Sequence, residues 1–271
     1  MSEIHESLQT RIKSLPPLPE SIVRIQEICN NPQSSISDLT GVVEKDPMLT
    51  ANLLKAANSP LYGFSREIKS VGQAISLFGM ATVKGFALAS AVRQTLKIDM
   101  TPYGITPDQF ANGSQNKSAL MLRWYPKVDR KRMDVLAPAS FLDGVGKVII
   151  AAELIKSGKS DAFKAELEGG KEPGDVENSF FETTAQMVSA AVFDHWRFEK
   201  ELIEAIKASD IPQEASEEFQ AYGYALKTIR EAVTLDGVIN NGTIAKAKTI
   251  LSMAGLDEKP FNEAIDAITS A

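Results

Sequence analysis

Apolar residues recur at helical spacing along almost the whole chain. In the segment IVRIQEIC, one helical face carries four of them: Ile22, Ile25, Ile28 and Cys29. Strict alternation of apolar and polar positions, the pattern of a half-buried strand, nowhere continues for more than a few residues. The pattern therefore predicts an all-α protein whose helices pack in at least two groups.

Helix starts and ends are clearly marked in the first third of the chain. Asp46 followed by Pro47 predicts an N-cap and a proline at the first helical position. Ser70 and Gln73 have the spacing of a capping box, and Gly79 predicts the end of the helix that follows them.

Later helices are predicted in the same way. Thr106 and Pro107 open a helix that continues to about residue 125. The amphipathic segments AQMVSAAVFDHW (185–196) and KELIEAIKAS (200–209) predict two more helices. Residues 211–271 are expected to form two or three further helices.

Two segments interrupt this pattern. Residues 96–107 separate a first group of helices from the next, and residues 157–177 have the polar, glycine-containing composition of a mobile loop. We therefore divide the chain into an N-terminal helical subdomain (1–105), a second helical subdomain (106–210) and a C-terminal helical extension (211–271).

Composition and charge narrow the function classes. Of the 271 residues 44% are hydrophobic and 24% are charged, as in soluble globular proteins. The net charge of −6 gives no electrostatic reason to expect nucleic-acid binding. The densest basic stretch, KVDRKR (127–132), is typical of a solvated helix end or loop.

The cellular location is predicted from cysteine usage and from hydrophobic runs. Cys29 is the one cysteine, so the chain has no internal disulfide and fits a reducing cytoplasm. The N-terminus lacks a signal-peptide pattern. No apolar run is expected to reach the roughly 20 residues that span a bilayer. We expect a cytoplasmic protein with no membrane contact.

Several motifs occur in a fixed order along the first 90 residues. They are LPPLP (15–19), DPMLTANLL (46–54), ANSPLYG (57–63) and IKSVGQAISLFG (68–79). In this order the motifs resemble the HDOD family of bacterial signalling proteins, and the resemblance continues more faintly to about residue 210. It implies an HD-like multi-helix fold, in which residues 106–210 form a degenerate HD-like subdomain.

The residues that carry the resemblance also have a structural interpretation. Prolines fix φ and hold the chain extended before the first long helix, and Asn58 and Ser59 can bond local backbone in a turn. Tyr62 offers its ring to the core, and Gly63 is expected in a conformation that disfavours other residues. We expect the signature to be structural at each position: Pro16, Pro19, Asp46, Pro47, Asn58, Ser59, Tyr62, Gly63 and Gly79.

HDOD proteins resemble HD-domain phosphohydrolases, in which histidines and a His-Asp pair hold a metal that acidifies water for attack on a phosphate ester. The resemblance places FLDGVGKVII (141–150) at the family's Leu-Leu-His-Asp-Ile-Gly-Lys motif. With Gly146 and Lys147 aligned, Asp143 replaces the histidine and Gly144 replaces the aspartate. Together with the family's other histidine positions they make a set that we call the former-ligand positions: Gly113, Asp143, Gly144, Ala185, Ser209 and Asp210.

The chain has two histidines, His5 and His195, and neither falls on a former-ligand position. Asp143 alone could still hold magnesium through waters, but no convergent second carboxylate is evident. The segment is not a phosphate-binding P-loop either, because Phe141 and Val148 occupy its glycine and Ser/Thr positions. We therefore expect no metal, no cofactor and no enzymatic activity.

Three functions remain open. The favoured hypothesis is a non-catalytic signalling module that acts on an unknown signalling protein through protein contacts. It would be a stand-alone member, since no receiver, GGDEF-like or DNA-binding segment is evident. An alternative is that the vestigial cleft binds a nucleotide or cyclic-dinucleotide second messenger, with Lys147 and Arg123 as conceivable phosphate partners. The third is a residual metal-dependent phosphohydrolase.

Overall fold

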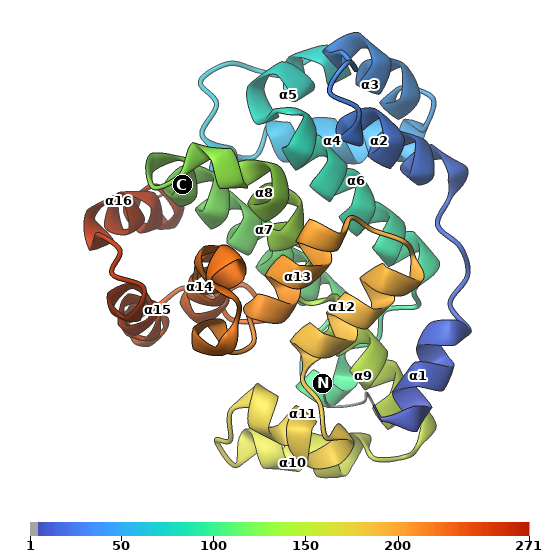
Figure 1. The fold of residues 1–271 in the computed structure, drawn as a ribbon, viewed down its shortest axis with the longest axis vertical. Coiled ribbons are helices and arrows are strands. Elements are labelled where there is room, and N and C mark those ends of the chain that lie inside the picture. Colours follow the sequence, from blue (N-terminus) through green and yellow to red (C-terminus); the bar gives the residue numbers. More distant parts are fainter. Residues whose placement is uncertain (1–4, 271) are drawn as a thin grey trace.

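The computed structural model describes residues 5–270, and within that range every regular element is helical (Figure 1). The prediction of an all-α fold is confirmed. One group of helices lies at one end of the molecule: α2 (Glu20–Asn30), α3 (Ile36–Val43), α4 (Pro47–Ala57) and α5 (Val71–Phe78). Helix α6 (Met80–Thr95) runs from this group into the centre.

The centre of the molecule is a second group of helices: α7 (Pro107–Trp124), α8 (Met133–Leu142), α9 (Val145–Lys156), α12 (Ala185–His195) and α13 (Lys200–Ala208). Helix α6 packs along α8 and so joins the two groups. The helices approach closely because Gly85 has no side chain, and a Cβ atom there would collide with Pro138 Cα.

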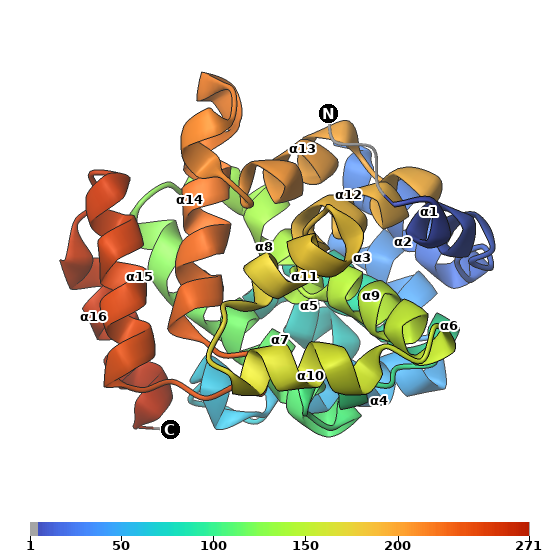
Figure 2. The same cartoon turned by 90° about the horizontal axis from the view of Figure 1, so that it is seen from below.

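The C-terminal extension forms three helices, as predicted: α14 (Glu217–Ala232), α15 (Asn241–Met253) and α16 (Glu258–Thr269). Figure 2 shows α14 between α15 and the central helices. Helix α14 contacts α7, α8 and α13, so the extension is part of the core around the centre. Short 3₁₀ turns join several helices: η1 (Pro60–Tyr62), η2 (Thr101–Tyr103), η3 (Tyr125–Lys127), η4 (Arg130–Arg132) and η5 (Pro212–Glu214).

The first helix, α1 (Glu6–Lys13), packs against α9 and α12 and lies far from α2 (Figure 1). Arg11 forms an ion pair with Glu153 of α9, at 2.9 Å. The proline segment 15–19 is extended as expected, and the indole N–H of Trp196 donates to the Pro16 carbonyl at 3.0 Å. The segment therefore ties α1 and α2 to different parts of the molecule.

The predicted helix boundaries are largely confirmed. The Asp46 carboxylate accepts the Leu49 N–H at 2.9 Å, and Thr106 forms a capping box with Gln109. The capping box predicted at Ser70 is wrong in one half: Ser70 accepts the Gln73 N–H, but the Gln73 side chain accepts the N–H of Lys69.

The mobile loop predicted at residues 157–177 is wrong. The segment forms α10 (Ser160–Glu168) and begins α11 (Pro173–Phe181). Phe163 is fully buried in edge-to-face contact with Tyr103 and Phe180. Apolar anchors spaced among polar residues hold these helices, because burying an aromatic ring outweighs the polar composition of their exposed faces.

The expectation that no apolar run could span a bilayer is also wrong by length and composition. Within the run Arg130–Lys156, which contains α8 and α9, an 18-residue window has a mean hydropathy of 1.6, and the pair α5–α6 passes the same test only if its 115° bend is ignored. However, 89% of the Arg130–Lys156 window is buried inside the protein. The run is apolar because other helices surround it.

The ANSPLYG turn lies between α4 and α5, within the first group of helices. Asn58 bonds both backbone groups of Ile68, and Ser59 accepts the Leu61 N–H. Tyr62 is buried edge-to-face against Phe78, with ring centroids 4.9 Å apart. Asn58, Ser59 and Tyr62 thus each make a local contact that shapes the turn.

Gly63 has φ +66°, a left-handed conformation that favours glycine, as does Gly79 with φ +81°. At Gly63 a second constraint applies. The Arg123 guanidinium of α7 donates to the Leu61 carbonyl at 2.7 Å and to the Pro60 carbonyl at 3.2 Å, and a Cβ atom at Gly63 would collide with it.

We expect Gly63→Ala to destabilise the protein by about 1–3 kcal/mol, because it adds backbone strain and displaces Arg123. Urea unfolding followed by circular dichroism measures the change. The matched control is Gly41→Ala within α3, where an added Cβ atom meets nothing within 4 Å. That variant should be up to about 1 kcal/mol more stable than the wild type. Equal stability of the two variants would contradict the assigned role of Gly63.

Candidate functional site

Asp143 and Gly144 lie at the junction where α8 ends and α9 begins. The sequence segment FLDGVGKVII is therefore the end of one helix and the start of the next, joined by a tight turn. The junction places the Asp143 carboxylate in the protein interior, with 3% of the side chain exposed.

Two cations from distant parts of the chain bind this carboxylate. Lys117 Nζ of α7 donates to Asp143 Oδ2 at 3.0 Å, and Arg230 Nη1 of α14 donates to Oδ1 at 2.9 Å. The side chains of Lys117 and Arg230 are 5% and 15% exposed. A carboxylate with one cation on each oxygen forms a buried ion cluster, which we call the Asp143 cluster: Lys117, Asp143 and Arg230.

The Asp143 cluster determines the charge state of its carboxylate. Burial alone would raise the pKa of Asp143, but the attraction of Lys117 and Arg230 and their hydrogen bonds outweigh burial. The pKa of Asp143 therefore lies below its usual value.

Arg230 also connects two other former-ligand positions. Its guanidinium donates to the Ser209 hydroxyl at 3.1 Å and to the Ser209 carbonyl, and Ser209 is fully buried. Burial raises the pKa of Asp210, although Arg230 and Lys227 act against it. Arg230 thus binds two former-ligand positions, Asp143 and Ser209, and Asp210 follows Ser209 directly in the chain.

Gly113 is covered by the C-terminal extension. A Cβ atom at Gly113 would collide with the carbonyl oxygen of Leu235, and Asn116 donates to the Gly237 carbonyl at 2.8 Å. A histidine at position 113 is therefore incompatible with the observed path of residues 235–237. Lys117 lies one helical turn beyond Gly113 and reaches Asp143 from the same face of α7.

The remaining two former-ligand positions lie in close helix contacts. An added Cβ atom at Gly144 would press on the Phe110 ring, and one at Gly146 would collide with the Ala185 carbonyl. The Gly146 N–H donates to the Ser189 hydroxyl at 2.7 Å. Small residues here let α9 and α12 meet without space for a ligand side chain.

A second buried ion pair lies next to these contacts. Lys147 pairs with Glu177 of α11, whose carboxylate also accepts the Tyr103 hydroxyl at 2.9 Å and the Ala185 N–H at 2.8 Å. Glu177 belongs to the segment predicted as a mobile loop, and its burial is a further reason for the order of that segment.

These donors do not fit a divalent metal. Two cations flank Asp143, and within residues 5–270 no three His, Cys, Asp or Glu side chains are grouped so that they could hold a metal ion. Both histidines are exposed: His5 caps α1, and His195 ends α12 with its Nε2 atom 3.4 Å from the Leu15 carbonyl. The two suggested phosphate partners, Lys147 and Arg123, already have protein partners.

The sequence interpretation missed Lys117, Arg230 and Glu177. Lys117 carried a signal, since it lies on the same helical face as Leu120 and Trp124, where a charged residue is unusual. Arg230 carried none, because the pairing depends on how α14 packs.

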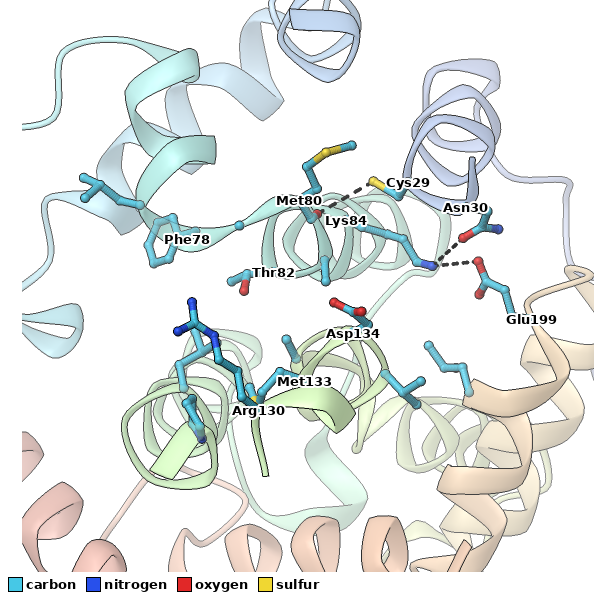
Figure 3. Close-up of a pocket in the computed structure, with 18 of the residues that line it drawn as sticks. Cys29, Asn30, Phe78, Met80, Thr82, Lys84, Arg130, Met133, Asp134 and Glu199 are labelled. Carbon is cyan, nitrogen blue, oxygen red and sulfur yellow. Dashed lines mark hydrogen bonds and ion pairs between the residues drawn. The ribbon is translucent and has the colours of Figure 1, made fainter. Parts of the chain in front are cut away.

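A cavity of about 780 Å³ lies between the two groups of helices (Figure 3). Lys84 of α6 crosses one end and donates to Asn30 at 3.0 Å and to Glu199 at 2.6 Å, which links α2 to the start of α13. Asp134 and Arg130 lie on the opposite wall from Met80. Cys29 also lines the cavity, and burial raises its pKa to about 11, so it is a poor nucleophile.

The fold defines the chain as an all-α protein of HD-like architecture. Residues 15–212 match the HDOD domain, and the chain belongs to this family. The match ends close to the boundary predicted at residue 210 and leaves the C-terminal extension outside.

Solved structures share this fold. A virulence factor from Campylobacter jejuni is 26% identical with a TM-score of 0.58, and the match covers 98% of this chain and 95% of that one. A candidate signal transduction protein from Marinobacter aquaeolei is 22% identical with a TM-score of 0.69, covering 98% of this chain and 64% of that one.

Among curated protein sequences, an uncharacterized protein of Treponema pallidum is 28% identical over 79 residues, which are 29% of this chain and 15% of the relative.

We expect Asp143→Asn to destabilise the protein by about 3–5 kcal/mol, because it leaves Lys117 and Arg230 buried without a counter-charge. Thermal and urea unfolding measure the change. Asp134→Asn, an exposed carboxylate of the same helix, should change stability by less than about 0.5 kcal/mol.

The Asp143→Asn variant also tests how the stability of the fold depends on pH. Because the folded pKa of Asp143 is lowered, its contribution is present above the unfolded pKa of about 3.9 and is lost as pH falls through the folded value. The stability lost between pH 6 and pH 3 should be smaller in Asp143→Asn than in the wild type. Identical losses would show that Asp143 is not a stabilising carboxylate.

Proposed function

We propose that this chain is a non-catalytic bacterial signalling module that acts through contacts with another protein. The observation that carries the proposal is the Asp143 cluster. Lys117 and Arg230 supply the positive charge beside Asp143. A metal there would have to displace two cations that already satisfy the carboxylate, so hydrolysis by a metal-bound water has no support in this donor set.

The family adds support for a signalling role. The motifs described above resemble the HDOD family of bacterial signalling proteins, to which the chain belongs, and one structure of the same fold is named as a candidate signal transduction protein. That this chain acts on another signalling protein is part of the proposal. A reducing, cytoplasmic setting suits the single cysteine of the chain.

The other two hypotheses require a change at the same place. A second messenger in the vestigial cleft would compete with the internal partners of Arg230, and Lys147 would have to leave Glu177. A residual phosphohydrolase would need ligands beyond Asp143. Neither is favoured by a specific contact.

Elemental analysis and a phosphodiesterase assay test the non-catalytic part. Protein purified without chelator should contain far less than one equivalent of manganese, iron or zinc, and added manganese should produce no turnover of phosphodiesters. Stoichiometric metal with turnover that Arg230→Met leaves intact and Asp143→Asn abolishes would overturn the proposal, since it would make Asp143 a ligand.

Affinity capture tests the protein-contact part. The tagged chain should retain one bacterial protein in near-stoichiometric amount, measured by quantitative mass spectrometry against a tag-matched control. Binding should be reproduced with the two purified proteins. A chain that retains nothing above the control under any growth condition argues against action through protein contacts.

A further inference from the structure

A second cavity, of about 630 Å³, lies where α4, α6 and α7 meet. Each helix contributes residues spaced i, i+4 and i+7, so that one stripe of each faces the cavity. The stripes are Met48, Asn52 and Lys55 of α4; Phe86, Ser90 and Arg93 of α6; and Asp108, Asn112 and Gln115 of α7. The volume lies in the range of small-molecule sites.

Arg93 is the unusual residue of this cavity. It is half-buried, and no hydrogen bond or ion pair of its guanidinium is found in the described part of the chain. Burial lowers the pKa of Arg93. Other buried or half-buried arginines have partners, such as Arg123 with backbone carbonyls and Arg230 with Asp143.

An unpaired, partly desolvated cation destabilises a folded protein, so its presence needs a compensating partner. Lys55 of α4 is exposed at the rim of the cavity, where it adds a second cation that has no ion pair among residues 5–270. A dianionic group between Arg93 and Lys55 would match both charges.

The other polar residues narrow the chemical class. The cavity offers hydroxyl donors from Ser59 and Ser90 and amide donors from Asn52, Asn112 and Gln115. A carboxylate has two oxygens for these donors, whereas a phosphate monoester has three and a charge of about −1.5 to −2. Asp108 supplies an acceptor for a hydroxyl or amino group elsewhere on the ligand.

We propose that this cavity binds a small phosphate-bearing molecule with a polar body, whose phosphate group lies between Arg93 and Lys55. The site is separate from the former-ligand positions and does not depend on the proposed signalling function. It lies between the N-terminal group of helices and α7, so a bound molecule would contact both.

Thermal unfolding of the full chain tests the proposal with inorganic phosphate, adenosine 5′-monophosphate and citrate. A phosphate-bearing probe should raise the melting temperature saturably, and citrate should not. Arg93→Met should weaken the apparent affinity about tenfold or more, because it removes a charge-assisted hydrogen bond. The control Arg130→Ala removes an exposed arginine from the other cavity and should leave the response unchanged.

The ligand-free variant provides a second readout. Since Arg93 has no internal partner, Arg93→Met should be at least as stable as the wild type without ligand. A large loss of stability would mean that Arg93 is structural and would overturn the proposal. An equal rise in melting temperature for wild type and Arg93→Met would be a general salt effect, with the same consequence. The absence of a saturable response to both phosphate probes, or a response to citrate alone, would also overturn the proposal.

Discussion

A carboxylate with almost no solvent exposure stays ionised only if cations are held against it, and at Asp143 this requirement joins three parts of the chain. Lys117 comes from α7, Arg230 from α14, and Asp143 from the junction of α8 and α9. Each partner is costly to bury alone, so the three stabilise one another. The centre of the fold is therefore held together by charged side chains of the protein itself.

This arrangement makes the C-terminal extension part of the centre. Arg230 enters the Asp143 cluster from α14, and Leu235 lies against Gly113 at a distance that excludes any side chain there. The two contacts depend on each other, since the path of residues 235–237 follows directly from the end of α14. A histidine at position 113 and the present extension cannot coexist. The observed path of the covering segment therefore requires glycine at position 113.

Local signals were readable from the sequence, whereas long-range pairings were not. The caps at Asp46 and Thr106 and the left-handed Gly63 depend on neighbouring residues, and they were predicted correctly. The order of residues 157–177 depends on contacts of Phe163 and Glu177 with Tyr103 and Lys147, which are distant in sequence. Periodicity identifies which face of a helix is buried, but it does not identify which helix packs against that face.

Helix α7 shows how this protein separates stability from recognition. One face carries Gly113 and Lys117 and is closed by the extension and by the Asp143 cluster, where every charge has a partner. The other face carries Asn112 and Gln115 and borders a cavity that holds the unpaired Arg93. A group with satisfied partners gains little from a ligand, whereas a desolvated charge without one gains a great deal. Among the described residues, the junction of α4, α6 and α7 therefore offers unused binding energy at a place away from the Asp143 cluster.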